Sequence, residues 1–283
     1  MGNPFAEDTS VEQVDEGRYR AFLSPRWNLR PLPQGGIVTA VALRAMEAML
    51  GDPAQTLRTS HTTFAAQVAD GPLEVEVDLL RRGRSMSQLR AEVRNVGAKR
   101  GHLTIATFGT PRTGPELLDV RPPTDVPRPE ACRSFRDPPP PGVDFEPMPF
   151  WEHQLDGRSA IGHMWWEDIE PGPADRSMWF RFDAPPITDD GHLDPFALPV
   201  LADMMPGAVA EGTGRSERPW FGPSVDLTFH RLADCSGGWI LGRNRARHAS
   251  DGYASADMEL WDMAGEPTLV AYATQVFFFT YLD

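Results

Sequence analysis

The apolar segment from Gly36 to Leu50 predicts a deeply buried helix. It reads GIVTAVALRAMEAML, and its few polar residues leave apolar side chains on nearly every side of a helix. A helix that is apolar on almost every face must be buried on almost every face. A strand expected at 17–24 precedes it, and turn residues separate the β-rich runs that follow, at 55–68, 72–82, 87–96 and 100–110. One buried helix followed by a meander predicts an antiparallel sheet that curls around the helix.

The same order returns in the second half of the chain. A strand expected at 178–183 precedes a mainly apolar segment, 194–210, in which Asp194 suits the N-cap and Pro195 the first helical position. Because an interior proline costs a helix about 3 kcal/mol or more, Pro199 predicts that this helix bends or starts late. More β-rich runs follow, at 222–232, 238–248, 253–262 and 268–281. Corresponding landmarks of the two halves lie 165 to 167 residues apart, which indicates an internal duplication.

Prolines separate the two halves. Twelve of the 28 prolines lie between Pro111 and Phe150, where missing N–H donors and a fixed φ exclude a helix or a central strand. We therefore expect an N-terminal unit at 1–112, a proline-rich linker at 113–150 and a C-terminal unit at 151–283. The predicted fold class is α+β, with each unit a curled antiparallel sheet wrapped around one long helix.

Composition and charge narrow the classes of partner. The net charge of -13 opposes binding to nucleic acid or to anionic lipid. The longest uncharged stretch, Pro267 to Leu282, has 16 residues, fewer than the roughly 18 to 20 that span a bilayer. The first residues show no leader pattern, and Cys132 and Cys235 are too far apart in sequence for a CxxC redox or zinc motif. We expect a cytoplasmic protein with reduced thiols.

Gln275 is the residue most in need of a polar partner. At period two along its strand its neighbours are all apolar, namely Leu269, Ala271, Ala273, Phe277 and Phe279. A carboxamide without partners in such a row costs on the order of 1 to 3 kcal/mol. Gln275 is therefore either a core glutamine bonded to backbone or part of a site.

Asp226 is the candidate carboxylate. On its predicted strand it shares a face with three polar residues, a pattern that a half-solvated strand also shows: Ser224, Thr228 and His230. The duplication adds a comparison, because the first half has His61 and Phe108 where the second half has Asp226 and Gln275. A carboxylate and an amide in one half alone predict a single site per chain.

Four short motifs occur in the order and spacing of a known family: Gly35-Gly36 before the first helix, RRGRSMS at 81–87, SVDLTFH at 224–230 and the glutamine of ATQVFF at 273–278. On these motifs the chain resembles the double-hotdog acyl-CoA thioesterases of the bacterial type II family. The resemblance spans both halves and leaves out the linker. It implies a tandem hotdog fold and hydrolysis of a fatty or related acyl-CoA to the free acid and coenzyme A.

The resemblance also implies a set of residues that activates water. In the family an aspartate on the strand after the second helix, a glutamine on the last strand and a hydroxyl residue between them hold the hydrolytic water. Asp226 and Gln275 match the first two, and Ser250 offers a hydroxyl near the third place. Because a thiolate leaves without strong acid assistance, this chemistry needs no metal, no other cofactor and no covalent nucleophile.

Two glycines and a group of arginines suit such a substrate. The backbone N–H groups of Gly35 and Gly36, at the positive end of the first helix, would stabilise the oxyanion, although a glycine pair also serves a tight turn. Arg82 and Arg84, at a strand end, would meet the phosphates of coenzyme A, with a solvated face as the alternative. A second set on one strand face is Arg243, Arg245 and Arg247. The candidates for an acyl slot are Trp27, Met204, Met205, Trp220, Phe221 and Phe277.

Two other functions stay open at this point. A non-catalytic acyl-CoA sensor or scaffold would bind the same ligand without turnover. An enoyl-CoA hydratase of the double-hotdog type would pair Asp226 with His230, which lie about 13 Å apart along a strand, and this distance disfavours it. No serine-nucleophile, zinc-protease or phosphate-loop motif occurs. We expect a small-molecule acyl-CoA partner and, from the sheet edges that a double unit exposes, a homo-oligomer.

Overall fold

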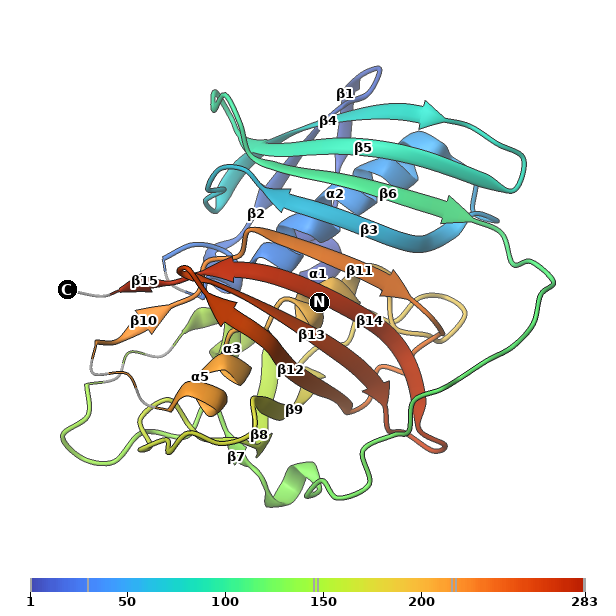
Figure 1. Ribbon diagram of the computed structural model, residues 1–283. Helices are drawn as coiled ribbons and strands as arrows, with labels where there is room; N and C mark the ends of the chain where they lie inside the picture. Colours follow the sequence, from blue (N-terminus) through green and yellow to red (C-terminus); the bar gives the residue numbers. More distant parts are fainter. Residues whose placement is uncertain are drawn as a thin grey trace.

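The computed structural model describes residues 2–29, 31–144, 146, 148–214, 216 and 218–281. Figure 1 shows two similar halves, with the blue-to-green strands of the first beside the orange-to-red strands of the second. The elements of the first half are α1 (Pro4–Thr9), β1 (Glu12–Asp15), β2 (Arg18–Leu23), η1 (Pro25–Trp27), α2 (Gly35–Leu50), β3 (Thr56–Phe64), β4 (Gly71–Arg81), β5 (Met86–Asn95) and β6 (His102–Gly109).

The second half repeats this plan after a connecting segment. The segment carries η2 (Pro129–Ala131), β7 (Arg133–Ser134) and α3 (Pro149–His153). The second unit then contains β8 (Leu155–Ile161), β9 (Asp175–Phe182), η3 (Pro195–Ala197), α4 (Leu198–Ala202), α5 (Gly207–Thr213), β10 (Trp220–Phe221), β11 (Asp226–Arg231), β12 (Ile240–Ser250), β13 (Tyr253–Asp262), β14 (Thr268–Phe278) and β15 (Thr280–Tyr281). The predicted strands are present within four residues at either end. The elements that were not predicted are α1, α3, the 3-10 turns η1 and η2, and the strands β1, β7, β8 and β10.

One antiparallel sheet runs through both units. Its order is β1-β2-β4-β5-β6-β3-β11-β14-β13-β12-β9-β8-β7, so the two halves join where β3 pairs with β11. At this seam Asp226 lies opposite Thr63 and Thr228 lies opposite His61. Helix α2 packs on the inner side of β4, β5 and β6, as the curled sheet around a buried helix requires (Figure 1). The predicted α+β architecture of two curled antiparallel units is confirmed. The one long helix expected in each unit is present only in the first, because α4 has five residues and α5 has seven.

The second helix starts late, as Pro199 predicted, and it is then broken after Ala202. Asp194 caps the 3-10 turn η3 by accepting a hydrogen bond from Phe196 N–H at 2.9 Å, and Pro199 lies in the first turn of α4. After Ala202 the backbone leaves the helical region, with φ -83° and ψ 50° at Asp203, and a new helix starts only at α5. The break releases Asp203 from regular helical geometry, so that its side chain lies between the two units.

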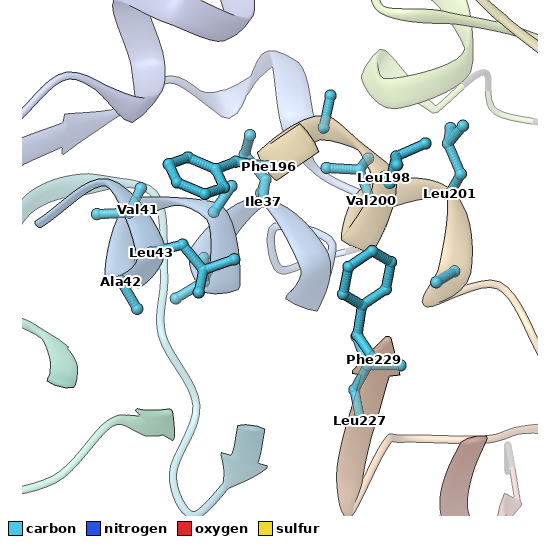
Figure 2. Close-up of a cluster of buried hydrophobic side chains, with 14 of the residues drawn as sticks. Ile37, Val41, Ala42, Leu43, Phe196, Leu198, Val200, Leu201, Leu227 and Phe229 are labelled. Carbon is cyan, nitrogen blue, oxygen red and sulfur yellow. The ribbon is translucent and has the colours of Figure 1, made fainter. Parts of the chain in front are cut away.

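The two helices meet in a shared apolar cluster. Figure 2 shows Ile37 and Val41 of α2 close to Phe196 and Val200 of the second half, with Phe229 of β11 rising toward them. At the crossing, a Cβ added to Gly36 would lie 2.3 Å from the carbonyl oxygen of Pro199. Only glycine permits this approach of α2 to α4.

Part of the proline-rich segment packs on the outer face of the sheet in the second unit. Trp179 Nε1 donates a hydrogen bond to Pro127 O at 2.8 Å, and Val126 and Cys132 pack against Trp179 and Trp261. The one strand that the structure describes in this segment, β7, pairs only with β8 at the edge of the sheet, as expected for a segment rich in proline. The segment therefore contributes to the core of the second unit. In the described part of the chain, no helix is long and apolar enough to cross a membrane.

Candidate functional site

A buried carboxylate, Asp203, lies at the break in the second helix and is 9% exposed. Its Oδ2 accepts hydrogen bonds from the Gly36 N–H at 3.0 Å and from Gln34 Nε2 at 3.1 Å. Its Oδ1 accepts hydrogen bonds from Ser224 Oγ at 3.1 Å and from Gln275 Nε2. The N-terminal unit and the C-terminal unit therefore each supply two donors to one carboxylate.

Burial raises the pKa of Asp203 to about 6, because desolvation penalises the charged form more than the hydrogen bonds from Gln275, Ser224 and the two glycines favour it. The positive end of α2 also faces this carboxylate. At neutral pH Asp203 is therefore ionised but holds a proton more readily than an exposed aspartate. Such a carboxyl group is suited to accept a proton and release it again.

This raised pKa predicts how the stability of the protein depends on pH. The folded state favours the protonated form, so the contribution of Asp203 is fully present below its ordinary pKa of 3.8 and is lost as the pH rises through about 6. The loss is on the order of 3 kcal/mol. Urea unfolding at about pH 4 and pH 7.5 should therefore show the Asp203→Asn variant gaining this amount relative to the native protein between the two pH values. Parallel pH dependences of the two proteins would contradict the raised pKa.

Gln275 completes the cluster. Its strand places it on the inner face beside Phe277, as the period-two pattern predicted, and it is 2% exposed. Its Nε2 donates hydrogen bonds to Asp203 and, at 2.9 Å, to Ser224 Oγ. Its Oε1 accepts no hydrogen bond from any described residue. The carboxamide therefore binds polar side chains, not backbone, and retains one acceptor for a further donor.

The glycine pair lies against Asp203. A Cβ at Gly35 would lie 2.6 Å from Phe64 Cε1 and 2.7 Å from Asp203 Oδ2. The Gly36 N–H donates to that carboxylate oxygen, and the next donor, Ile37 N–H, is accepted by Gln34 Oε1 at 3.1 Å. The predicted use of the Gly36 N–H for an oxyanion is therefore corrected: in this structure it holds the carboxylate.

Asp226 does not lie beside Gln275. Thr228 pairs with Thr274 across β11 and β14, so Asp226 shares the outward face of these residues whereas Gln275 faces inward. One carboxylate oxygen of Asp226 accepts a hydrogen bond from Val276 N–H at 2.7 Å, and the other lies 4.0 Å from His61 Nδ1. The expectation that Asp226 and Gln275 share one water is corrected, because the sheet lies between their side chains.

Ser250 and the two arginines also lie away from the cluster. Ser250 is the last residue of β12. It lies two strands away from β14, opposite a position three residues beyond Gln275, so the backbones of Ser250 and Gln275 are roughly 14 Å apart. Its exposed hydroxyl pairs with His248 Nε2 at 3.0 Å. Arg82 Nη2 donates to Leu50 O at 2.9 Å at the far end of α2, and Arg84 is exposed. The hydroxyl near Gln275 belongs to Ser224.

Sequence reasoning therefore missed Asp203 and the role of Ser224. A signal for Asp203 was present, because it is the one charged residue in the apolar run from Phe196 to Ala210. Ser224 was expected on the outer face with Asp226, and the strand pairing that turns it inward leaves no sequence signal. Among the described residues, no group of three His, Cys, Asp or Glu side chains is arranged to hold a metal ion.

Comparisons with known proteins bear on this arrangement. The family model of the acyl-CoA thioesterase C-terminal domain matches residues 129–279, beginning inside the predicted linker where η2 starts, and the model of the N-terminal domain matches residues 23–109. The thioesterase-like protein TwmA of Talaromyces wortmannii is 33% identical over 87 residues, so the match spans 30% of this chain and only 25% of that protein.

Two solved structures are similar over their full length. A conserved protein with the hot dog fold from Alicyclobacillus acidocaldarius has a TM-score of 0.81 at 23% identity, covering 100% of both chains. The acyl-CoA thioesterase II TesB2 of Mycobacterium marinum has a TM-score of 0.74 at 21% identity, covering 99% of both chains. These similarities show the fold, a tandem hotdog, as predicted.

Proposed function

Because the chain belongs to the acyl-CoA thioesterase family, we propose that it hydrolyses an acyl-CoA thioester with Asp203 as the general base. The observation that carries the proposal is the hydrogen-bonded cluster of one buried carboxylate with a hydroxyl and a carboxamide, Asp203 with Ser224 and Gln275. Asp203 lies at the N-terminus of α2, where it accepts the Gly36 N–H, and the other two side chains donate to Asp203. A carboxylate of raised pKa beside two groups that orient water is the equipment that direct hydrolysis requires.

In this mechanism water binds between Gln275 and Asp203. The water donates one hydrogen to Gln275 Oε1, which accepts no hydrogen bond from any described residue. Its other hydrogen points to the carboxylate of Asp203. Asp203 takes that proton as the oxygen attacks the thioester carbon. The C–S bond then breaks, and the proton passes to the departing sulfur, which gives coenzyme A and the free acid. The positive end of α2 favours negative charge throughout.

The pKa of Asp203 predicts the pH dependence of the rate. Because the base must be ionised, kcat/KM should fall about tenfold per pH unit below pH 6 and stay level above about pH 7. A pH profile of thioester hydrolysis at low substrate concentration measures this directly. A break near the ordinary aspartate pKa of 3.8, or no break at all, would contradict the assignment of Asp203 as the buried base.

The proposal is tested with a panel of acyl-CoA esters of graded chain length and detection of the free thiol. Release of one thiol per free acid formed supports hydrolysis, and the panel identifies the acyl length. Tight binding of every ester without thiol release would favour the sensor or scaffold. The structure does not support the hydratase alternative. Asp226 and His230, its expected acid and base, both lie on the outer face of β11, away from the buried cluster.

Association of the double units and a cytoplasmic location are also proposals. The two ends of the sheet are short: β1 has four residues and β7 has two. Short edge strands resist pairing with another sheet. We therefore expect the homo-oligomer to associate through faces of the sheet and not through its edges. Sedimentation equilibrium measures the assembly.

A further inference from the structure

The pairing of β11 with β14 contains an irregularity beside the cluster. Ser224 pairs with Phe277 in an isolated bridge, and Thr228 pairs with Thr274 in the regular ladder. Four residue steps on one strand therefore match three steps on the other. One extra residue is accommodated at Val225–Asp226, which is the definition of a β-bulge.

The bulge decides the direction of the Ser224 side chain. Without an extra residue, Ser224 would share the outward face of Thr228, which lies four residues further along the strand. With it, Ser224 pairs with Phe277, whose side chain is fully buried on the inner face. The Ser224 hydroxyl consequently reaches Asp203 Oδ1 at 3.1 Å and Gln275 Nε2 at 2.9 Å.

The carboxylate of Asp226 closes this bulge from the outer face. Val225 N–H donates to Val276 O at 2.8 Å, and the Val276 N–H is accepted by Asp226 Oδ1 at 2.7 Å and not by a backbone carbonyl. The Val225 carbonyl is already used, because it accepts the Phe64 N–H of the other unit at 3.0 Å. The side chain of Asp226 therefore replaces the backbone carbonyl that would otherwise accept the N–H of Val276, the residue next to Gln275.

We propose that Asp226 is a positioning residue, which pins the bulge and so keeps Ser224 within reach of Asp203 and Gln275. It contacts neither substrate nor the attacking water, since it lies on the opposite face of the sheet, where it lines a hollow with Arg247 and Thr274. The consequence for the rate rests on the proposed thioesterase activity. The consequence for the backbone does not, and it is measured separately.

The kinetic test compares Asp226→Ala with Asp226→Asn, using Thr228→Ala on the same outer face as the matched control. Asparagine keeps an oxygen that can accept the Val276 N–H, so it should retain kcat within about threefold, whereas alanine should lower kcat by about tenfold to a hundredfold with little change in KM. The Thr228→Ala variant should behave as the native protein. Equal losses for asparagine and alanine, or full activity for alanine, would overturn the proposal.

A double-mutant cycle tests whether Asp226 acts through Ser224. If it does, Asp226→Ala should have little further effect on kcat in a Ser224→Ala background, because the group it positions is already absent. Additive losses would overturn the proposal.

Backbone exchange gives a readout that needs no activity. The Val276 amide should lose its protection against hydrogen exchange in Asp226→Ala and keep it in Asp226→Asn. If the native protein hydrolyses no acyl-CoA, the proposed function is wrong. The exchange measurement still tests whether Asp226 holds the bulge. A Val276 amide equally protected in the native and Asp226→Ala proteins would overturn the positioning role.

Discussion

The Asp203→Asn variant is expected to hydrolyse acyl-CoA with a kcat/KM lower by on the order of 10² to 10⁴-fold. Asparagine has nearly the shape of aspartate, and its oxygen can still accept the hydrogen bonds of Gly36 and Gln34. Its NH₂ group faces Ser224 and Gln275, whose hydroxyl and amide can each turn to accept. What is lost is the capacity to take a proton from water. Free-thiol release from the best ester of the panel measures the effect.

The control for this experiment removes a carboxylate elsewhere. Asp119 is exposed in the proline-rich segment, so Asp119→Asn changes the net charge equally and should leave kcat/KM unchanged. Circular dichroism and binding of a CoA ester by the Asp203→Asn variant show that it is folded. If the folded variant has a kcat/KM within tenfold of the native value, Asp203 is not the general base.

Replacing Gly36 by alanine is expected to destabilise the protein by about 3 kcal/mol, even though alanine is the better helix former. The new Cβ would lie 2.3 Å from Pro199 O and 2.7 Å from Val200 Cα, which are backbone atoms that cannot rotate away. Helices α2 and α4 must then separate, and Asp203 moves with the end of α4. The free energy of unfolding, from urea titration, measures the effect.

Gly114 provides the matched control for Gly36. It lies in the proline-rich segment, and a Cβ added there would meet no atom within 4 Å. Gly114→Ala should therefore leave the free energy of unfolding within about 0.5 kcal/mol of the native value. A Gly36→Ala variant as stable as this control would show that the helix crossing tolerates a side chain.

The fold followed closely from local signals. Glycine-containing turns at 70–71, 83 and 97 delimit the strands of the first unit, and an all-apolar helix had to lie inside a curled sheet. The late start of the second helix was predicted because proline is not tolerated inside a helix, and Pro199 lies in the first turn of α4. The break after Ala202 was not predicted. The strands that were missed, such as β8 with the sequence LDGRSAI, lack the alternation that reveals a strand. Their place depends on pairing with distant residues.

The site was harder to predict for a different physical reason. The inward direction of Gln275 follows from alternation along β14 between Ala271 and Phe277, a stretch that lies beyond the irregularity at Leu269–Ala271. Ser224 and Asp226 lie on either side of Val225. The extra residue at this point reverses which side chains face inward in the part of the strand that precedes it, including Ser224. A bulge of this kind depends on pairing between strands far apart in sequence, so alternation assigned Ser224 the wrong face.

Asp203, at the end of α4, was also missed because its partners are distant in sequence. Its position between Pro199 and Pro206 marked an irregular end of a helix, and its charge was anomalous among apolar neighbours. The groups that make it useful come from residues far away in sequence, with Gln34 and Gly36 in one unit and Ser224 and Gln275 in the other. Only the joining of the two units, where β3 pairs with β11, brings these donors to one carboxylate.

The most direct test of the account is a single turnover of an acyl-CoA in H₂¹⁸O with enzyme in excess, followed by mass spectrometry of the acid and of the peptide that contains Asp203. If the cluster holds the attacking water, the released acid carries one ¹⁸O atom and the peptide carries none. An unlabelled acid with ¹⁸O in Asp203 would show that the carboxylate itself attacks the thioester. Turnover without label in either product would exclude water as the nucleophile.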